Sequence, residues 1–223
     1  MTADTNYKNV MEFCRAEGAD LFGVADIDGC KEEFALSARI KESMTRAVSL
    51  AVRLSPAVLD DIDNAPTRLY FHHYRTANGF LDQLAFKTSL YIQKKGFKAV
   101  PIGASQIVDW QKQTAHLSHK KIGVLAGIGW IGRNNLLVNV QLGSQFRLVT
   151  ILTDIPLSVD KQLAFSCGEC RACVTKCPAG AIGDTPESFE HMKCFEKLKE
   201  FQKKRLVDQY ICGVCVNACQ GKR

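Results

Sequence analysis

The sequence predicts an α+β protein in which a layered α/β domain is followed by a small module rich in cysteine. Short β-branched runs alternate with helical patterns in the first 160 residues, and eight of the ten cysteines fall between Cys167 and Cys219. Pro156 lies between these two regions and marks a boundary. We therefore expect two domains, residues 1–160 and residues 161–223, joined near residues 156–165.

The first predicted elements are a helix and two strands. The helix begins after the polar pair Asp4 and Thr5 and stops before Gly18, and its core stripe consists of Tyr7, Val10, Met11 and Cys14. Apolar runs predict strands over residues 21–27 and 47–54, and a helix around residues 31–42 separates them.

The next elements are helical and then extended. Residues 67–95 form one long helix or a pair broken at Gly79, since one face is apolar throughout. Residues 97–102 predict a strand in which Pro101 indicates an edge position. We expect residues 136–140 and 146–153 to be two strands of a hairpin, joined across Gly143.

The composition is that of a globular protein, with 46% hydrophobic and 23% charged residues. The longest apolar stretch, residues 122–132, is too short to cross a membrane, and the N-terminus lacks the pattern of a secretory signal. We therefore expect a cytoplasmic protein with no membrane contact. Since that compartment keeps thiols reduced, ten cysteines favour metal or redox chemistry over disulfides.

The cysteine spacing predicts iron–sulfur clusters. Residues 167–178 read C-x2-C-x2-C-x3-C-P, the run of bacterial ferredoxins, in which the fourth cysteine ligates a second cluster. Four more cysteines follow, which makes enough ligands for two 4Fe–4S clusters. By analogy with that crossed ligation, we assign Cys167, Cys170, Cys173 and Cys219 to one cluster and Cys177, Cys194, Cys212 and Cys215 to the other.

Two other interpretations of these residues are open. Paired C-x2-C groups also bind zinc, and cysteines at helical spacing also line apolar helix faces.

The net charge of the chain is +6, and residues 161–223 carry +4 of it. The lysine-rich segment 197–205 is more typical of a solvated helix face than of a docking surface for nucleic acid or a donor protein.

A glycine-rich loop precedes the cysteine module. Gly127, Gly129 and Gly132 match G-x-G-x-x-G, but a helical pattern precedes them and a strand follows, the reverse of a nicotinamide site. We expect the backbone of this loop to approach a flat ligand closely, since side chains are missing at three points. Trp130 either stacks on that ligand or fills the core.

The chain contains four motifs in this order: AGIGWIGRNNLL, RLVTILTDIPL, CGECRACVTKCPAGAI and CGVCVNAC. With these motifs the sequence resembles the epoxyqueuosine reductase family and, more distantly, the corrinoid-dependent reductive dehalogenases. The resemblance implies a nitroreductase-like domain that holds base-off cobalamin, with clusters that reduce its cobalt for reductive removal of a leaving group from a small substrate. The residues implied to line the corrinoid are Gly127, Gly129, Trp130, Gly132, Arg133 and Asn134. FMN is an alternative cofactor, because nitroreductase-like layers commonly hold it.

The sequence departs from the family at the expected proton donor. Gln113 stands where the family carries a general-acid aspartate, so we consider Asp109, His116 and His119 as proton donors. The chain stops soon after Cys219, without the extension of tRNA-modifying members, so we do not expect action on tRNA.

These departures leave two functions open. The leading hypothesis is a reductase that takes electrons from a low-potential donor such as ferredoxin or flavodoxin. The alternative is an electron-transfer protein that reduces or reactivates a separate corrinoid or flavin protein and has no substrate of its own.

Overall fold

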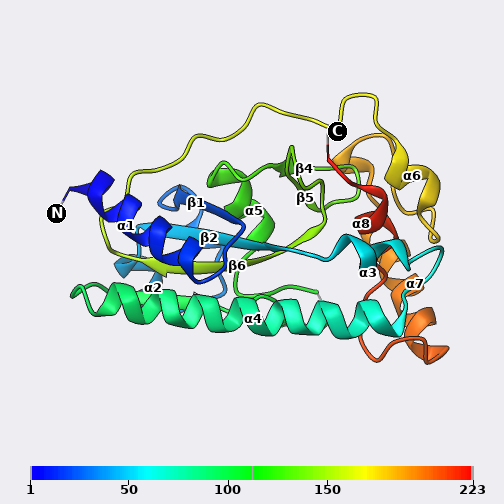
Figure 1. Ribbon diagram of the computed structural model, residues 1–223, viewed down its shortest axis with the longest axis horizontal. Coiled ribbons are helices and arrows are strands. Elements are labelled where there is room, and N and C mark those ends of the chain that lie inside the picture. Colours follow the sequence, from blue (N-terminus) through cyan, green and yellow to red (C-terminus); the bar gives the residue numbers. More distant parts are fainter. Residues whose placement is uncertain (1, 112, 222–223) are drawn as a thin grey trace. The chain divides into compact units, whose positions relative to one another are not determined.

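The computed structural model describes residues 2–111 and 113–221 and divides the chain into two compact units (Figure 1). The first unit comprises residues 1–52, 78–128 and 147–163, and the second comprises residues 53–77, 129–146 and 164–223. These units differ from the predicted domains 1–160 and 161–223. Residues 53–77 and 129–146 belong with the cysteine-rich segment because their backbones bond to it and to each other, as described below.

The first unit is built on a four-stranded sheet in the order β1-β2-β6-β3. Its strands are β1 (Leu21–Asp26), β2 (Arg46–Arg53), β6 (Phe146–Thr153) and β3 (Ala99–Ile102). β1 runs antiparallel to β2, and β3 runs antiparallel to β6. The predicted edge position of the strand that contains Pro101 is confirmed, since β3 ends the sheet.

Helices cover both faces of this sheet. The ring of Tyr7 in α1 (Ala3–Ala16) packs on Phe22 of β1 with centroids 5.3 Å apart. The next residue, Gly23, lies against Ala126 at the end of α5 (His119–Leu125). Because successive residues of a strand point to opposite faces, α1 and the end of α5 lie on opposite sides of β1.

The long helix α4 (Arg68–Gln93) continues through Gly79, so of the two predicted alternatives the single helix is confirmed and the break is not. Gly79 costs an exposed helix about 1 kcal/mol relative to alanine, and burial of Leu81 and Leu84 offsets that cost. In the first unit, α4 packs beside α1. The ring of Tyr91 stacks on Phe13 with centroids 4.3 Å apart.

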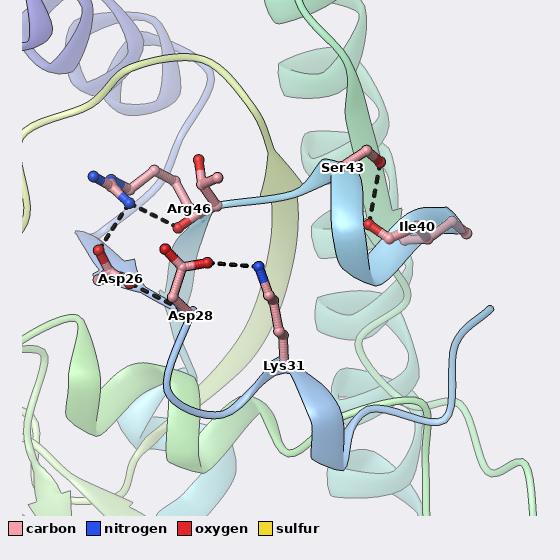
Figure 2. Close-up of polar contacts among 7 residues, drawn as sticks. Asp26, Asp28, Lys31, Ile40, Ser43 and Arg46 are labelled. Carbon is pink, nitrogen blue, oxygen red and sulfur yellow. Dashed lines mark hydrogen bonds and ion pairs between the residues drawn. The ribbon is translucent and has the colours of Figure 1, made fainter. Parts of the chain in front are cut away.

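The predicted helix around residues 31–42 is divided into the 3-10 turn η1 (Lys31–Glu33) and α2 (Ala38–Ser43). Phe34 and Ser37, which bound the segment between them, have extended backbones, and the backbone N–H of Ala35 bonds to the carbonyl of His116 at 2.8 Å. Polar contacts fix the neighbouring strand ends (Figure 2). Arg46 donates to Asp26 at 2.9 Å, and Lys31 pairs with Asp28 at 2.6 Å.

The second unit contains short helices and one small hairpin (Figure 1). Its elements are α3 (Pro56–Asp60), β4 (Trp130–Ile131), β5 (Leu137–Val138), α6 (Ala172–Lys176), the 3-10 turn η2 (Pro186–Ser188), α7 (His191–Lys203) and α8 (Val214–Ala218), together with the first part of α4. Lys197 and Lys199 on α7, and Lys204 at its C-cap, pair with glutamates of this helix. These pairs are typical of a solvated helix face.

The predicted hairpin of residues 136–140 and 146–153 is wrong. β5 pairs with β4, Trp130 opposite Val138, whereas β6 lies between β2 and β3 in the sheet. A turn that contains Asn135 at φ 56° closes β4 onto β5, which leaves the stretch around Gly143 free to bond elsewhere. Among the described residues, no helix is long and apolar enough to cross a membrane.

Candidate functional site

All eight cysteines of the predicted clusters lie in the second unit, and each carries a free thiol. Cys173, Cys194 and Cys215 lie on α6, α7 and α8, whereas Cys177 and Cys219 cap the ends of α6 and α8. The remaining three, Cys167, Cys170 and Cys212, lie in loops. α6 and α8 contact each other, and this contact joins the two ends of the cysteine-rich segment.

The thiols form two groups of neighbours. Burial raises the pKa of Cys173 to about 11, and the neighbouring charges of Cys219, Cys167 and Cys170 raise this pKa further. Burial likewise raises the pKa of Cys212 to about 11, with Cys194 and Cys177 as its charged cysteine neighbours.

Cys215 completes the second group. Burial raises its pKa well above the ordinary thiol range, and Cys212, Cys194 and Cys177 add to the shift. The two groups of neighbours are therefore Cys167, Cys170, Cys173 and Cys219, and Cys177, Cys194, Cys212 and Cys215. The charge of Cys173 also raises the pKa of Cys215, so the two groups adjoin.

This donor set suits a metal that binds thiolate sulfur. Burial makes it costly in free energy to deprotonate a thiol, and a bound cation that neutralises the thiolate offsets this cost. In residues 2–111 and 113–221, no group of three or more histidine, cysteine or acidic side chains is arranged so that it could hold one metal ion. Ligation of two clusters by the two groups is accordingly a proposal, which we take up below.

Backbone hydrogen bonds position the cysteines. The N–H of Ser144 donates to the carbonyl of Cys219 at 3.0 Å, and the side chain of Gln145 donates to the carbonyl of Asn217 at 3.0 Å. The N–H of Ala181 lies 3.4 Å from the sulfur of Cys177. Sequence analysis missed Ser144 and Gln145, because no local pattern relates them to a segment so distant in the sequence.

The same segment ties residues 53–77 into the second unit. The side chain of Asn217 donates to the carbonyl of Ile62 at 3.0 Å, and the N–H of Leu54 donates to the carbonyl of Gln145 at 2.9 Å. These bonds connect α8 and the loop after β5 to the chain on either side of α3.

The three glycines of the loop are required by the chain itself. A Cβ at Gly127 would lie 2.5 Å from the carbonyl of Lys161, and one at Gly129 would collide with the carbonyl of Val138. A Cβ at Gly132 would lie 2.5 Å from the Val138 side chain. The space that we expected for a flat ligand on the side-chain side of these glycines is therefore filled by protein.

The other residues implied to line a corrinoid have distinct surroundings. Asn134 is buried and donates to Ser144 at 3.2 Å, while Arg133 donates to carbonyls of the Cys167–Cys170 loop. Trp130 is only 8% exposed and its ring lies 5.8 Å from that of Phe165. Its indole N–H is the kind of buried donor that a ligand satisfies, since it has no hydrogen-bond partner within the described part of the chain.

The candidate proton donors lie in the first unit and differ in environment. Both ring nitrogens of His119 are engaged, Nδ1 with Thr150 at 2.8 Å and Nε2 with the carbonyl of Gly103 at 2.9 Å. Burial lowers the pKa of His119 to about 4, so this ring is neutral at pH 7. These contacts argue against His119 as a proton donor.

Asp109 and His116 are more accessible. Asp109 accepts a hydrogen bond from the N–H of Gln111 at 2.9 Å, and Nδ1 of His116 lies 2.9 Å from the carbonyl of Ala35. Gln113 adopts φ 53° and its side chain bonds to the carbonyl of Trp110, so it closes the turn that carries Asp109. Sequence analysis did not single out Lys120, whose pKa is lowered by burial.

Comparison with known proteins finds epoxyqueuosine reductases among the relatives of this chain. No family model matches the chain. The epoxyqueuosine reductase of Leadbetterella byssophila is 26% identical over 95% of this chain and 78% of its own length. The epoxyqueuosine reductase of Yersinia pestis is 40% identical over 85 residues, which are 38% of this chain and 20% of that protein. The chain thus spans only part of some relatives.

Two kinds of solved structure share the fold. A reductive dehalogenase whose description concerns B12-dependent dehalogenation aligns with a TM-score of 0.77 at 19% identity, over 97% of this chain and 32% of its own. An epoxyqueuosine reductase in complex with an epoxyqueuosine-modified tRNA stem loop aligns with a TM-score of 0.61 at 19% identity, over 96% of this chain and 64% of its own.

Proposed function

Since this chain is homologous to the epoxyqueuosine reductase family, we propose that it is an iron–sulfur oxidoreductase that uses cobalamin to remove a leaving group reductively from a small substrate. The observation that carries the proposal is the gathering of eight free thiols into two adjoining groups of four in the second unit. Two adjoining groups of this size are typical of two-cluster electron-transfer modules.

Each group would hold one 4Fe–4S cluster. Cys167, Cys170, Cys173 and Cys219 would ligate the first, and Cys177, Cys194, Cys212 and Cys215 the second. A 4Fe–4S cluster with four thiolates is anionic, and N–H groups aimed at its sulfur atoms stabilise that charge. The N–H of Ala181, which lies 3.4 Å from the sulfur of Cys177, would serve in this way.

Cobalamin in the base-off form is the cofactor that we propose beside the clusters. When bound, it supplies a cobalt centre that low-potential electrons reduce and that cleaves a bond from carbon to the leaving group. The unpartnered indole N–H of Trp130 supports a ligand at the glycine-rich loop, where it would donate to an acceptor of that ligand. FMN is the alternative occupant, since its ring and phosphate also carry acceptors.

The chain's own residues would supply the proton. Asp109 and His116 are the donors that we propose, because their hydrogen bonds lie in exposed surroundings, whereas His119 is neutral and doubly bonded. The electrons would come from a low-potential carrier such as ferredoxin or flavodoxin. The relative with a bound stem loop makes tRNA a substrate to test beside small molecules, although we favour the latter.

An electron-transfer protein without a substrate is the second candidate. Gln113 carries an amide where the family resemblance implies an acid, and His119 is held neutral, so two of the positions nearest the glycine-rich loop in sequence cannot supply a proton. On this hypothesis the clusters would reduce a separate corrinoid or flavin protein.

The deciding experiment is anaerobic reconstitution followed by cofactor titration. We expect eight iron and eight acid-labile sulfide per chain, and a cobalamin spectrum that shifts to the base-off form on addition of protein. Zinc without sulfide would refute the cluster proposal. Intact clusters without cobalamin binding would favour the electron carrier, and tight FMN binding would favour a flavin enzyme.

Turnover then separates enzyme from carrier. Reduced methyl viologen supplies electrons, and epoxyqueuosine nucleoside, epoxyqueuosine-modified tRNA and 3-bromo-4-hydroxybenzoic acid serve as probes, the last because a relative of similar fold binds it. We expect one small-molecule probe to be consumed. Asp109→Asn or His116→Ala should abolish that turnover and leave iron content unchanged.

A further inference from the structure

Arg133 bonds to the loop that carries the first cysteine group. It lies in the turn between β4 and β5, and its two terminal nitrogens donate to two carbonyls of that loop, one to Gly168 at 2.8 Å and the other to Cys170 at 3.0 Å. A guanidinium forms such paired bonds with a fixed geometry that the single ammonium of lysine does not reproduce. Gly168 adopts φ 53°, so one of the two bonds holds the loop at a residue with a left-handed backbone.

The turn that carries Arg133 also lies directly against a thiol. A Cβ at Gly132 would come within 3.5 Å of the sulfur of Cys167. Since Arg133 follows Gly132 and its guanidinium reaches the carbonyls of Gly168 and Cys170, its cation lies beside the loop that carries the first group of thiols. None of the ion pairs found among residues 2–111 and 113–221 involves Arg133, so no carboxylate in that set offsets its charge.

We infer that Arg133 is a positioning residue that fixes the Cys167–Cys170 loop and raises the reduction potential of the cluster held by Cys167, Cys170, Cys173 and Cys219. This inference rests on the proposed function, and it gives Arg133 a role other than lining the corrinoid. A reduced cluster carries one more negative charge than an oxidised one, so a nearby cation stabilises the reduced form more and moves the potential upward.

The charge and the fork can be separated by substitution. Arg133→Gln removes the charge, and we expect one of two midpoint potentials to become more negative while the other stays in place. Arg133→Lys keeps the charge but loses the fork, so the potential should stay near that of the wild type. The loosened loop should instead release its iron faster to a chelator.

Arg46→Gln is the matched control. Arg46 also donates to carbonyls, those of Thr45 and Leu157, and its loss changes the net charge equally, but it lies in the first unit and donates to no cysteine among the described residues. Both midpoint potentials should be unchanged in this variant. The wild type, the two Arg133 variants and this control are compared as reconstituted full-length protein.

The measurement is a mediated redox titration with dithionite as the one-electron source, followed by electron paramagnetic resonance of the reduced clusters. An unchanged pair of potentials in Arg133→Gln, or equal shifts in Arg46→Gln, would overturn the inference. Wild-type protein without sulfide would instead refute the proposed function, so the two failures are distinguishable. If Arg133→Gln does not fold, an unchanged rate of iron release in Arg133→Lys decides against the positioning role.

Discussion

The carbonyl oxygen of Cys219 accepts a hydrogen bond from the backbone N–H of Ser144 at 3.0 Å, and this bond ties the last cysteine of the chain to the segment that follows the β4–β5 hairpin. The residue before Ser144 is Gly143, which adopts φ 57° and whose Cβ would collide with that same carbonyl. The position of one proposed cluster ligand therefore depends on the absence of a side chain elsewhere.

Gly143→Ala should destabilise the second unit by about 2 kcal/mol or more, since a left-handed residue and a backbone collision are both introduced. Thermal unfolding and iron content measure the effect, and we expect about half of the iron to be lost with the first cluster. Gly79→Ala is the control, because nothing lies within 4 Å of its Cβ position on α4. That change should be neutral or stabilise by about 1 kcal/mol. Equal stability of the two variants would contradict the close approach.

Cys194→Ala should lower the iron content of reconstituted protein by about half, because it removes one of four ligands from the second group. Cys14→Ala should retain all of it, since the Cys14 thiol is buried in the first unit and lies 3.4 Å from the hydroxyl of Thr88. Iron and sulfide assays distinguish the two. Retention of full iron in Cys194→Ala would remove this residue from the ligand set.

His119 makes stability depend on pH. Its pKa is about 4 in the folded protein because of burial and about 6.5 when unfolded, so the unfolded chain binds the proton first as the pH falls. The contribution of His119 to the free energy of unfolding is fully present above pH 6.5 and is lost as the pH falls toward 4. Between pH 7 and pH 5 this loss amounts to about 2 kcal/mol.

The comparison variant for this prediction is His119→Gln, which cannot titrate. Urea unfolding of both proteins at pH 7 and pH 5 isolates the histidine, because every other titrating group is shared, including Asp82 and Arg147 beside the ring. Parallel stability curves would show that His119 is not held neutral.

Trp130→Phe tests the ligand at the glycine-rich loop. Loss of the indole N–H should weaken cobalamin binding about tenfold, the size of one hydrogen bond of about 1.4 kcal/mol. Absorbance titration with cobalamin gives the dissociation constant, and the same titration with FMN identifies which ligand depends on the N–H. Unchanged affinity for both ligands would place the cofactor away from Trp130.

The sequence by itself determined the elements whose signal is local. The helix α1 with its stop at Gly18, the two strands β1 and β2, and the edge position of Pro101 follow from apolar period and turn residues. The cysteine spacing likewise identified one set of eight thiols, because seven of them lie in two short local runs.

Only the tertiary structure decided which distant segments meet. The partner of β5, the passage of residues 53–77 and 129–146 into the second unit, and the fork of Arg133 all depend on contacts between residues far apart in the chain. A local pattern records whether a residue favours burial or a turn, but not which backbone atom will approach it. For the same reason, the glycines that indicated a ligand cradle lie against the chain itself, Gly127 and Gly129 against carbonyls and Gly132 against the Val138 side chain.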